Sequence, residues 1–487
     1  MLSQIKRLGT DTAIYGISTI LGRFLSFLLV FFYTNVLFPR EYGIVATVYA
    51  VIAFLNIIYA YGLESAYFKY SSTLELGTAK QNFSTPFMSL AATSLVLSCL
   101  ILALSGPIGR GLAVPGAYPS VIPYSAGILF LDTLAIIPFA SLRMEHRPGL
   151  FATLKFLTIG VNVACNLVFL LVFRAGIEGI FLSGLISSAF TVATLLPTIA
   201  RHLTLDFSTP LYRALLAFGL PYVPAGLATM VIQVVDRPVM RMMTDAATVG
   251  VYQANYRLGI FMMLIVSMFD YAWRPFFLAR AADPGAKQLF ARVLTYFVAV
   301  TSFLFLCISF FIGDLVRIRL FGRFLIGPDY WGGLSIVPVI LLAYMFLGVY
   351  NNLVAGIYIE KKTRRLPGIT LAGALANIVA NFALIPLMGM MGAAIATLIA
   401  YVVMALALYR DVRKFYPVEY EWGRILKIAA AAGAVFGLHL LLDAGSLCIP
   451  WNILLVALFC GLLFVFRFFN ADEKRTLRGL FRRTPPG

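Results

Sequence analysis

The sequence predicts an all-α polytopic membrane protein with about fourteen transmembrane helices. Hydrophobic residues make up 61% of the 487 positions and charged residues only 12%, whereas a soluble domain carries about 25% charged residues. Apolar runs of about 20 residues recur along the whole chain, and this length crosses a bilayer as a helix. The expected spans are 11–37, 42–62, 82–105, 118–141, 149–173, 177–200, 212–235, 248–270, 289–313, 333–358, 366–387, 391–409, 425–443 and 450–468.

Short loops join the spans, and the longest, near residues 313–332, is too short to hold a soluble domain. With the amino terminus in the cytoplasm, 27 of the 38 Lys and Arg residues fall on the cytoplasmic side and 8 outside. This asymmetry predicts a multi-pass membrane protein with both termini in the cytoplasm. The net charge of +17 then reflects topology and contact with membrane lipids, and no nucleic-acid partner is expected.

Neither a cofactor nor a metal is expected, because the 5 cysteines lie singly in apolar segments without metal-binding spacing. The 3 histidines are isolated, so no acid–base constellation predicts an enzyme. The phosphate-loop pattern G-x-x-x-x-G-K-[ST] does not occur, and ATP hydrolysis by this chain is not expected.

A repeat divides the sequence. Asn162 and Asn166 in the fifth span match Asn377 and Asn381 in the eleventh, each pair at i, i+4. A weaker similarity links PREYGIVATVYA (39–50) with DAATVGVYQANY (245–256). We therefore expect an N-lobe of six spans (1–212), a C-lobe of six spans (213–424), and spans 13–14 with a basic cytoplasmic tail (425–487). Two such parallel repeats, pseudo-symmetric about a central cavity, occur in transporters.

The segments FGLPYVPAGLATMVIQVVDRPVM (218–240), VGVYQANYRLG (249–259) and AWRPFF (272–277) resemble the Wzx-like polysaccharide-biosynthesis flippases. This branch belongs to the superfamily that also contains the MATE drug exporters and the lipid II flippase. The resemblance implies a two-lobed fold whose central cavity opens alternately to each side, with a portal toward the bilayer beside the first and eighth spans.

Three cations lie more than one helical turn inside predicted spans: Arg23, Lys155 and Arg257. A charge at mid-bilayer costs about 2.5–3.5 kcal/mol, so it should face water, a partner or a ligand. Each lies on the same helix face as other polar side chains, three or four residues away. Alternatively, Lys155 reaches the membrane surface, and the two arginines pair with acidic side chains.

Further polar side chains extend these helix faces. Gln233 lies on the seventh span, Tyr252 and Tyr256 lie on the eighth, and the four repeated asparagines would face the cleft or serve as glue between helices. Asp236-Arg237 is interpreted as a local salt bridge or helix cap. Asp132, Glu64 and Asp270 are candidates for ion coupling, or for neutralising the cations.

The cationic cleft suits an anionic cargo, because arginine binds phosphate through forked donors. The resemblance implies a polyprenyl-pyrophosphate-linked oligosaccharide, flipped for O-antigen, capsule or exopolysaccharide assembly, with a polysaccharide polymerase and chain-length proteins as candidate partners. The alternatives are a MATE-like exporter of small molecules, a membrane glycosyltransferase or polymerase, and a structural scaffold.

Overall fold

The computed structural model describes residues 27–442 and 449–466, together with Gly22, Leu25 and Phe468. Within these residues, 12 helices are long and apolar enough to cross a membrane, and two shorter apolar helices, Phe27–Val36 and Ile449–Val465, accompany them. The predicted all-α membrane fold with about fourteen spans is confirmed. Arg23 lies outside the described residues.

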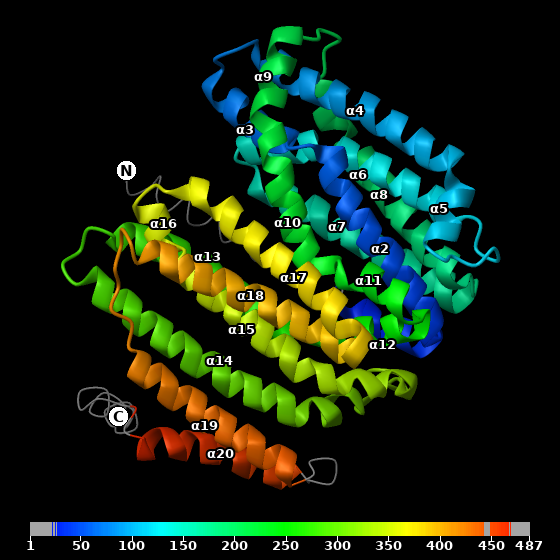
Figure 1. Cartoon of the computed structure of the whole chain (residues 1–487). Coiled ribbons are helices and arrows are strands. Elements are labelled where there is room, and N and C mark those ends of the chain that lie inside the picture. Colours follow the sequence, from blue (N-terminus) through cyan, green and yellow to red (C-terminus); the bar gives the residue numbers. More distant parts are fainter. Residues whose placement is uncertain (1–21, 23–24, 26, 443–448, 467, 469–487) are drawn as a thin grey trace, which may run out of the picture.

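The first group of helices, the N-terminal group, occupies the upper right of Figure 1. In it α6 packs against α4 and α8, α7 packs against α8, and α3 contacts α4 and α6. Its elements are α2 (Pro39–Ala60), α3 (Leu63–Thr73), α4 (Ala79–Ala103), α5 (Ser105–Gly111), α6 (Val121–Met144), α7 (Pro148–Leu167), the π-helix η1 (Val168–Val172) and α8 (Gly176–His202).

The second group, the C-terminal group, is built around α15, which packs against α13, α14 and α18, while α17 packs against α10 and α18. Its elements are α10 (Val223–Val234), α11 (Asp236–Met243), α12 (Ala246–Leu258), α13 (Ile260–Arg280), α14 (Ala286–Val316), the antiparallel strands β1 (Arg319–Leu320) and β2 (Arg323–Phe324), the 3-10 helix η3 (Pro328–Ile336), α15 (Val337–Leu353), α16 (Ala355–Ile359), the 3-10 turn η4 (Thr363–Arg365), α17 (Leu366–Met388) and α18 (Met390–Val412). The remaining two helices, α19 (Trp422–Leu441) and α20 (Ile449–Val465), pack on α14.

Helix α9 (Thr209–Gly219) links the groups. It lies against α3 and α4 of the N-terminal group, whereas α10, which follows it, lies against α17 and α2. Between them the chain passes through the 3-10 turn η2 (Leu220–Tyr222). Pro221 lies in this turn and Pro224 in the first turn of α10, and proline interrupts α-helical bonding because it removes a hydrogen bond and clashes with the preceding turn.

The eighth span is longer and more broken than predicted. The sequence predicts one helix over 248–270, whereas α12 ends at Leu258 and α13 continues to Arg280. At the break, a Cβ atom on Gly259 would lie 2.5 Å from the Ile340 side chain. The absence of a side chain at Gly259 therefore lets the junction of α12 and α13 approach α15 closely.

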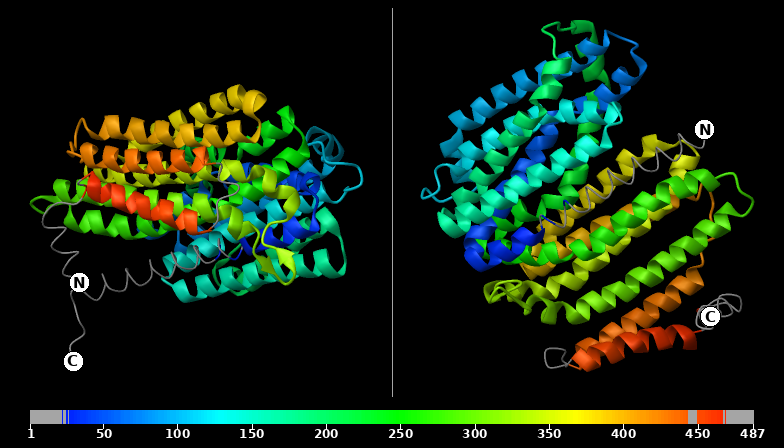
Figure 2. Two further views of the ribbon diagram at one scale, coloured as in Figure 1. Left: turned by 90° about the horizontal axis from the view of Figure 1, so that it is seen from below. Right: turned by 180° about the vertical axis from the view of Figure 1, so that it is seen from behind.

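The two groups meet where the first turns of α2 and α12 cross, and in Figures 1 and 2 they diverge from this point. A Cβ atom on Gly43 would lie 1.7 Å from the carbonyl oxygen of Ala246, and one on Gly250 would lie 1.9 Å from that of Pro39. Only glycine permits such contact between backbones. The cavities described below lie next to this crossing.

Candidate functional site

Two cavities lie between the helix groups and share part of their walls. The C-side cavity has a volume of about 580 Å³ and the N-side cavity about 380 Å³. Helices α2 and α12 line both cavities. The C-side cavity is completed by α10, α11, α13, α15 and α18, and the N-side cavity by α6, α7, α8 and the helix Phe27–Val36. Cavities of this size and position are typical of ligand sites.

Among the described residues, four line both cavities: Ala46 and Tyr49 on α2, and Gln253 and Arg257 on α12. The Arg257 side chain is exposed to the cavities, and the described residues offer it no hydrogen bond or ion pair. A guanidinium at this depth is costly unless it meets water, a partner or a ligand. Among the described residues, Arg257 is therefore the side chain best placed to bind an anion.

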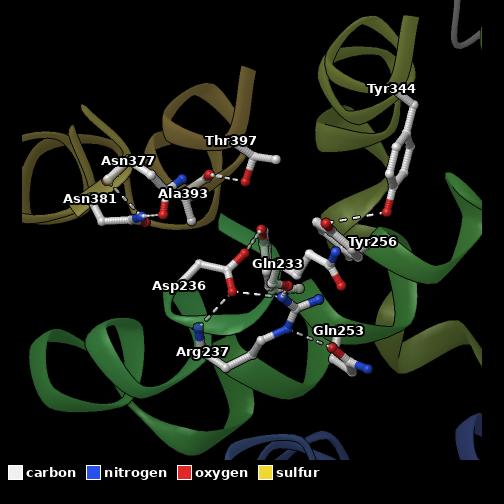
Figure 3. A network of polar contacts seen from close by, with 11 residues as sticks. Gln233, Asp236, Arg237, Gln253, Tyr256, Tyr344, Asn377, Asn381, Ala393 and Thr397 are labelled. Carbon is white, nitrogen blue, oxygen red and sulfur yellow. Dashed lines mark hydrogen bonds and ion pairs between the residues drawn. The ribbon is translucent and has the colours of Figure 1, made fainter. Parts of the chain in front are cut away.

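A second arginine, Arg237, is buried beside the C-side cavity in a closed polar network (Figure 3). Its guanidinium donates to Asp236 Oδ1 at 2.6 Å and to Gln253 Oε1 at 3.0 Å, and it lies 4.2 Å from the centre of the Tyr256 ring. Asp236 Oδ2 accepts a hydrogen bond from the Tyr252 hydroxyl at 2.5 Å. The interpretation of Asp236-Arg237 as a local salt bridge is confirmed. The network fixes α11 against α12.

Aromatic rings and amides form one wall of the C-side cavity. The centroid of the Tyr344 ring lies 6.2 Å from that of Tyr256 and 6.4 Å from that of Tyr401, and the Tyr344 hydroxyl donates to that of Tyr256 at 3.2 Å. Gln233 and Asn351 add amide groups to the same cavity. Flat apolar faces beside hydroxyls and amides suit the two faces and the rim of a sugar ring.

The N-side cavity contains a carboxylate. Asp132 on α6 is exposed to this cavity and accepts a hydrogen bond from the Ser188 hydroxyl at 2.6 Å. Lys155 on α7 is also exposed, and its ammonium lies 4.1 Å from the centre of the Phe139 ring, outside the described wall of the cavity. Thr158, one turn further along α7, does line it.

The predicted asparagines fall in different places. Asn162 lines the N-side cavity, and Asn166 is buried behind it, where it accepts a hydrogen bond from the Tyr33 hydroxyl at 2.8 Å. Asn377 and Asn381 are both buried in α17 and bonded to each other. The described walls of the two cavities do not include this second pair.

Two of the three predicted acidic candidates form ion pairs. Glu64 pairs with Arg143, so α3 and α6 are joined. Asp270 lines the C-side cavity and pairs with Arg274 one turn along α13 at 3.0 Å. Of the three, only Asp132 has no ion pair among the described residues.

Several lining residues are missed by sequence reasoning, chiefly Tyr344, Asn351 and Tyr401. Tyr344 and Asn351 are seven residues apart on one face of the tenth span, a spacing that could have identified them. Tyr401 gives no such signal, because a single tyrosine in a span resembles an ordinary core residue. Within the described residues, no group of three or more His, Cys, Asp or Glu side chains gathers to hold a metal.

The sequence model of the polysaccharide biosynthesis protein family matches residues 34–324, which is more than half of the chain. The chain belongs to that family. A search of curated proteins gives no match.

Solved structures show the same fold. The lipid II flippase MurJ in an inward closed conformation is 16% identical with a TM-score of 0.73, over 96% of this chain and 100% of that one. An inward-facing multidrug resistance MATE transporter of the MOP superfamily is 14% identical with a TM-score of 0.60, over 80% and 94%. The MATE transporter VcmN of Vibrio cholerae, in its bent form, is 15% identical with a TM-score of 0.54, over 84% and 96%. These similarities show that the chain has the transporter fold of that superfamily.

Proposed function

We propose that the protein is a flippase that moves a polyprenyl-pyrophosphate-linked oligosaccharide across the bacterial inner membrane by alternating access. The observation that carries the proposal is Arg257, an exposed guanidinium without an internal partner among the described residues, at the junction of two cavities. The family, whose members take part in polysaccharide biosynthesis, supplies the class of cargo. The transporter fold supplies the mode of action.

The diphosphate of the cargo would bind at Arg257. A guanidinium presents forked donors that match two phosphate oxygens at once. The sequence places Arg23 and Lys155 as further cations on the path. The structure does not describe Arg23. Lys155 lies outside the described cavity wall, and its exposed ammonium would attract the diphosphate as the cargo enters.

The sugars would bind in the two cavities on either side of the diphosphate. In the C-side cavity Gln233 and the rings of Tyr256 and Tyr344 would receive sugar hydroxyls and ring faces. In the N-side cavity Asn162 and Asp132 would accept or donate hydrogen bonds. Tyr252 would act through Asp236, to which its hydroxyl is bonded, and the buried pair Asn377 and Asn381 would support the fold of α17.

Energy for transport would come from an ion gradient, the membrane potential or consumption of the cargo outside the cell. Asp132 is the acidic side chain best placed for coupling, because Glu64 and Asp270 are already in ion pairs. The placement of lysines and arginines supports cytoplasmic termini. A polymerase and chain-length proteins that receive the cargo on the outer side are the expected partners.

A MATE-like export of small molecules is the second candidate, because MATE transporters share the fold. An exporter of organic cations needs acidic or aromatic groups without an unpaired cation at its centre. The position of Arg257 favours the anionic cargo. Removal of this protein should abolish surface polysaccharide if it is the flippase, and should impair drug export if it is the exporter.

The experiment deletes the gene and measures how much lipid-linked oligosaccharide lies in each leaflet of the inner membrane. The proposal predicts that the lipid-linked oligosaccharide accumulates on the cytoplasmic leaflet and that surface polysaccharide disappears. Complementation by the parent chain or by Arg110→Ala should restore surface polysaccharide and remove the accumulated lipid-linked oligosaccharide. Arg110 is a suitable control because it is an exposed arginine outside the two cavities. Normal polysaccharide with impaired drug export would instead favour the MATE-like function.

A further inference from the structure

The segment Arg319–Tyr330 lies against the N-terminal group at the face of the membrane where α14 ends. It contains the hairpin β1–β2, whose turn residues Phe321 and Gly322 have φ values of 52° and 80°, and the beginning of η3. The hairpin lies beside the start of α2 in Figure 2. It belongs to the C-terminal group by sequence, yet it bonds to the residues that precede α2.

The hairpin and Asn35 exchange two hydrogen bonds. Asn35 Nδ2 donates to the carbonyl oxygen of Phe324 at 2.8 Å, and Arg323 Nη1 donates to the carbonyl oxygen of Asn35 at 3.1 Å. Both bonds join the C-terminal group to the residues that precede α2. Bonds of this kind must break if the groups separate at this face.

Tyr330 adds a buried connection. Its hydroxyl donates to the carbonyl oxygen of Leu37 at 2.9 Å, while its own carbonyl oxygen accepts from Asn255 Nδ2 on α12 at 2.7 Å. The Tyr330 ring has 0% of its surface exposed and lies edge-on to Tyr42, which lines the N-side cavity, at 6.0 Å between centroids. One residue therefore bonds to both groups and backs the wall of the cavity.

Gly327 allows the closest approach. A Cβ atom there would lie 2.0 Å from the carbonyl oxygen of Thr34. Its φ of −56° and ψ of 142° are open to any residue, so the backbone conformation does not require glycine. The contact with the opposite helix group does.

We propose that Arg319–Tyr330 is a latch that closes the two cavities toward this face and detaches from Thr34–Leu37 when they open there. The three hydrogen bonds and the Gly327 contact all join the same short stretch before α2 to the same segment. In the proposed flippase, the latch is the contact that breaks when alternating access opens the cavities to this face. Its test uses neither cargo nor transport.

The test measures access to the C-side cavity from the latch face. The five natural cysteines are replaced, and a single cysteine is placed at Ala53, which is half-buried in the wall of that cavity. A membrane-impermeant maleimide is added to membrane vesicles whose latch face is outside. Gly327→Ala is compared with Gly332→Ala, since a Cβ atom on Gly332 meets nothing within 4 Å.

The latch predicts several-fold faster labelling in Gly327→Ala, with Gly332→Ala labelled at the parent rate. Tyr330→Phe removes only the hydroxyl and should accelerate labelling by about two- to tenfold, the effect of one intramolecular hydrogen bond. If Gly327→Ala does not reach the membrane, Tyr330→Phe decides alone. Unchanged labelling in Tyr330→Phe, or equal labelling in the two glycine variants, overturns the latch and leaves the flippase proposal standing.

Discussion

Asn381 donates through Nδ2 to the carbonyl oxygen of Asn377 at 2.9 Å and to its Oδ1 at 3.1 Å. Asn166 makes the same two bonds to Asn162, at 2.8 and 3.2 Å. The asparagine pairs that suggested a sequence repeat thus share one hydrogen-bond motif. This agreement supports the proposed duplication of residues 1–212 and 213–424, in which the two pairs should lie at equal depths.

The two pairs should nevertheless respond differently to mutation. Asn381→Ala removes a buried bond that lies outside the described cavity walls, so it should lower stability by about 0.6 kcal/mol and leave transport unchanged. Asn162→Ala removes a side chain of the N-side cavity and should slow transport. Surface polysaccharide in a complemented deletion strain, with membrane protein quantified, separates the two effects. Equal transport defects in both variants would contradict the assignment.

The buried ion pair should be essential for stability. Arg237→Ala leaves the carboxylate of Asp236, which is 1% exposed, without its counter-ion, and loss of one partner of a buried pair costs about 3–5 kcal/mol. Arg274→Ala breaks a pair in which Arg274 is exposed and Asp270 is partly buried, and for a pair near the surface about 0.2–1 kcal/mol is expected. Equilibrium unfolding in mixed micelles measures both.

The double variant Asp236→Ala, Arg237→Ala supplies the control for this ion pair. Because it leaves neither charge unpaired, it should be destabilised by less than the sum of the two single variants. A simple sum would show that the two side chains act independently.

Asp245 should give stability a pH dependence confined to acid. The backbone N–H of Thr248 donates to its carboxylate at 2.8 Å and caps α12, and this bond, as the largest cause, lowers the pKa of Asp245. A lowered folded pKa means that the stabilisation is complete above the unfolded pKa, about 3.9, and is lost as the pH falls through the folded pKa.

Loss of this cap in Asp245→Ala should therefore cost about 1 kcal/mol at neutral pH. Thermal unfolding in detergent should show a constant difference from the parent between pH 6 and 8. That difference should shrink only below about pH 4. A difference that varies between pH 6 and 8 would assign the effect to another group.

Much of the fold could be predicted because membrane spans are local signals. Apolar length and the placement of lysines and arginines define them without knowledge of their neighbours. Arg257 could be found for the same reason, as a single charge in an apolar run. The 3-10 turn at Pro221 is likewise encoded locally.

The rest of the site depends on which face of each helix meets the cavity. By pattern, Asn377 is indistinguishable from Asn162, yet only Asn162 lies in a described cavity wall. Tyr401 looks like a core residue until α18 is placed beside α15. The latch at Gly327 is invisible in the sequence, because the atom that requires glycine is a backbone oxygen of Thr34.

The central claim is that Arg257 binds the diphosphate of a lipid-linked oligosaccharide. The most direct measurement is binding and flipping of a polyprenyl-pyrophosphate-linked oligosaccharide by purified protein in liposomes. A charge-assisted hydrogen bond contributes about 1.5–3 kcal/mol, so Arg257→Ala should weaken binding by about ten- to a hundredfold. Arg257→Lys should recover only part of it, because an ammonium lacks the forked donors, and Arg110→Ala should match the parent. Flipping by Arg257→Ala at the parent rate and affinity would contradict the account.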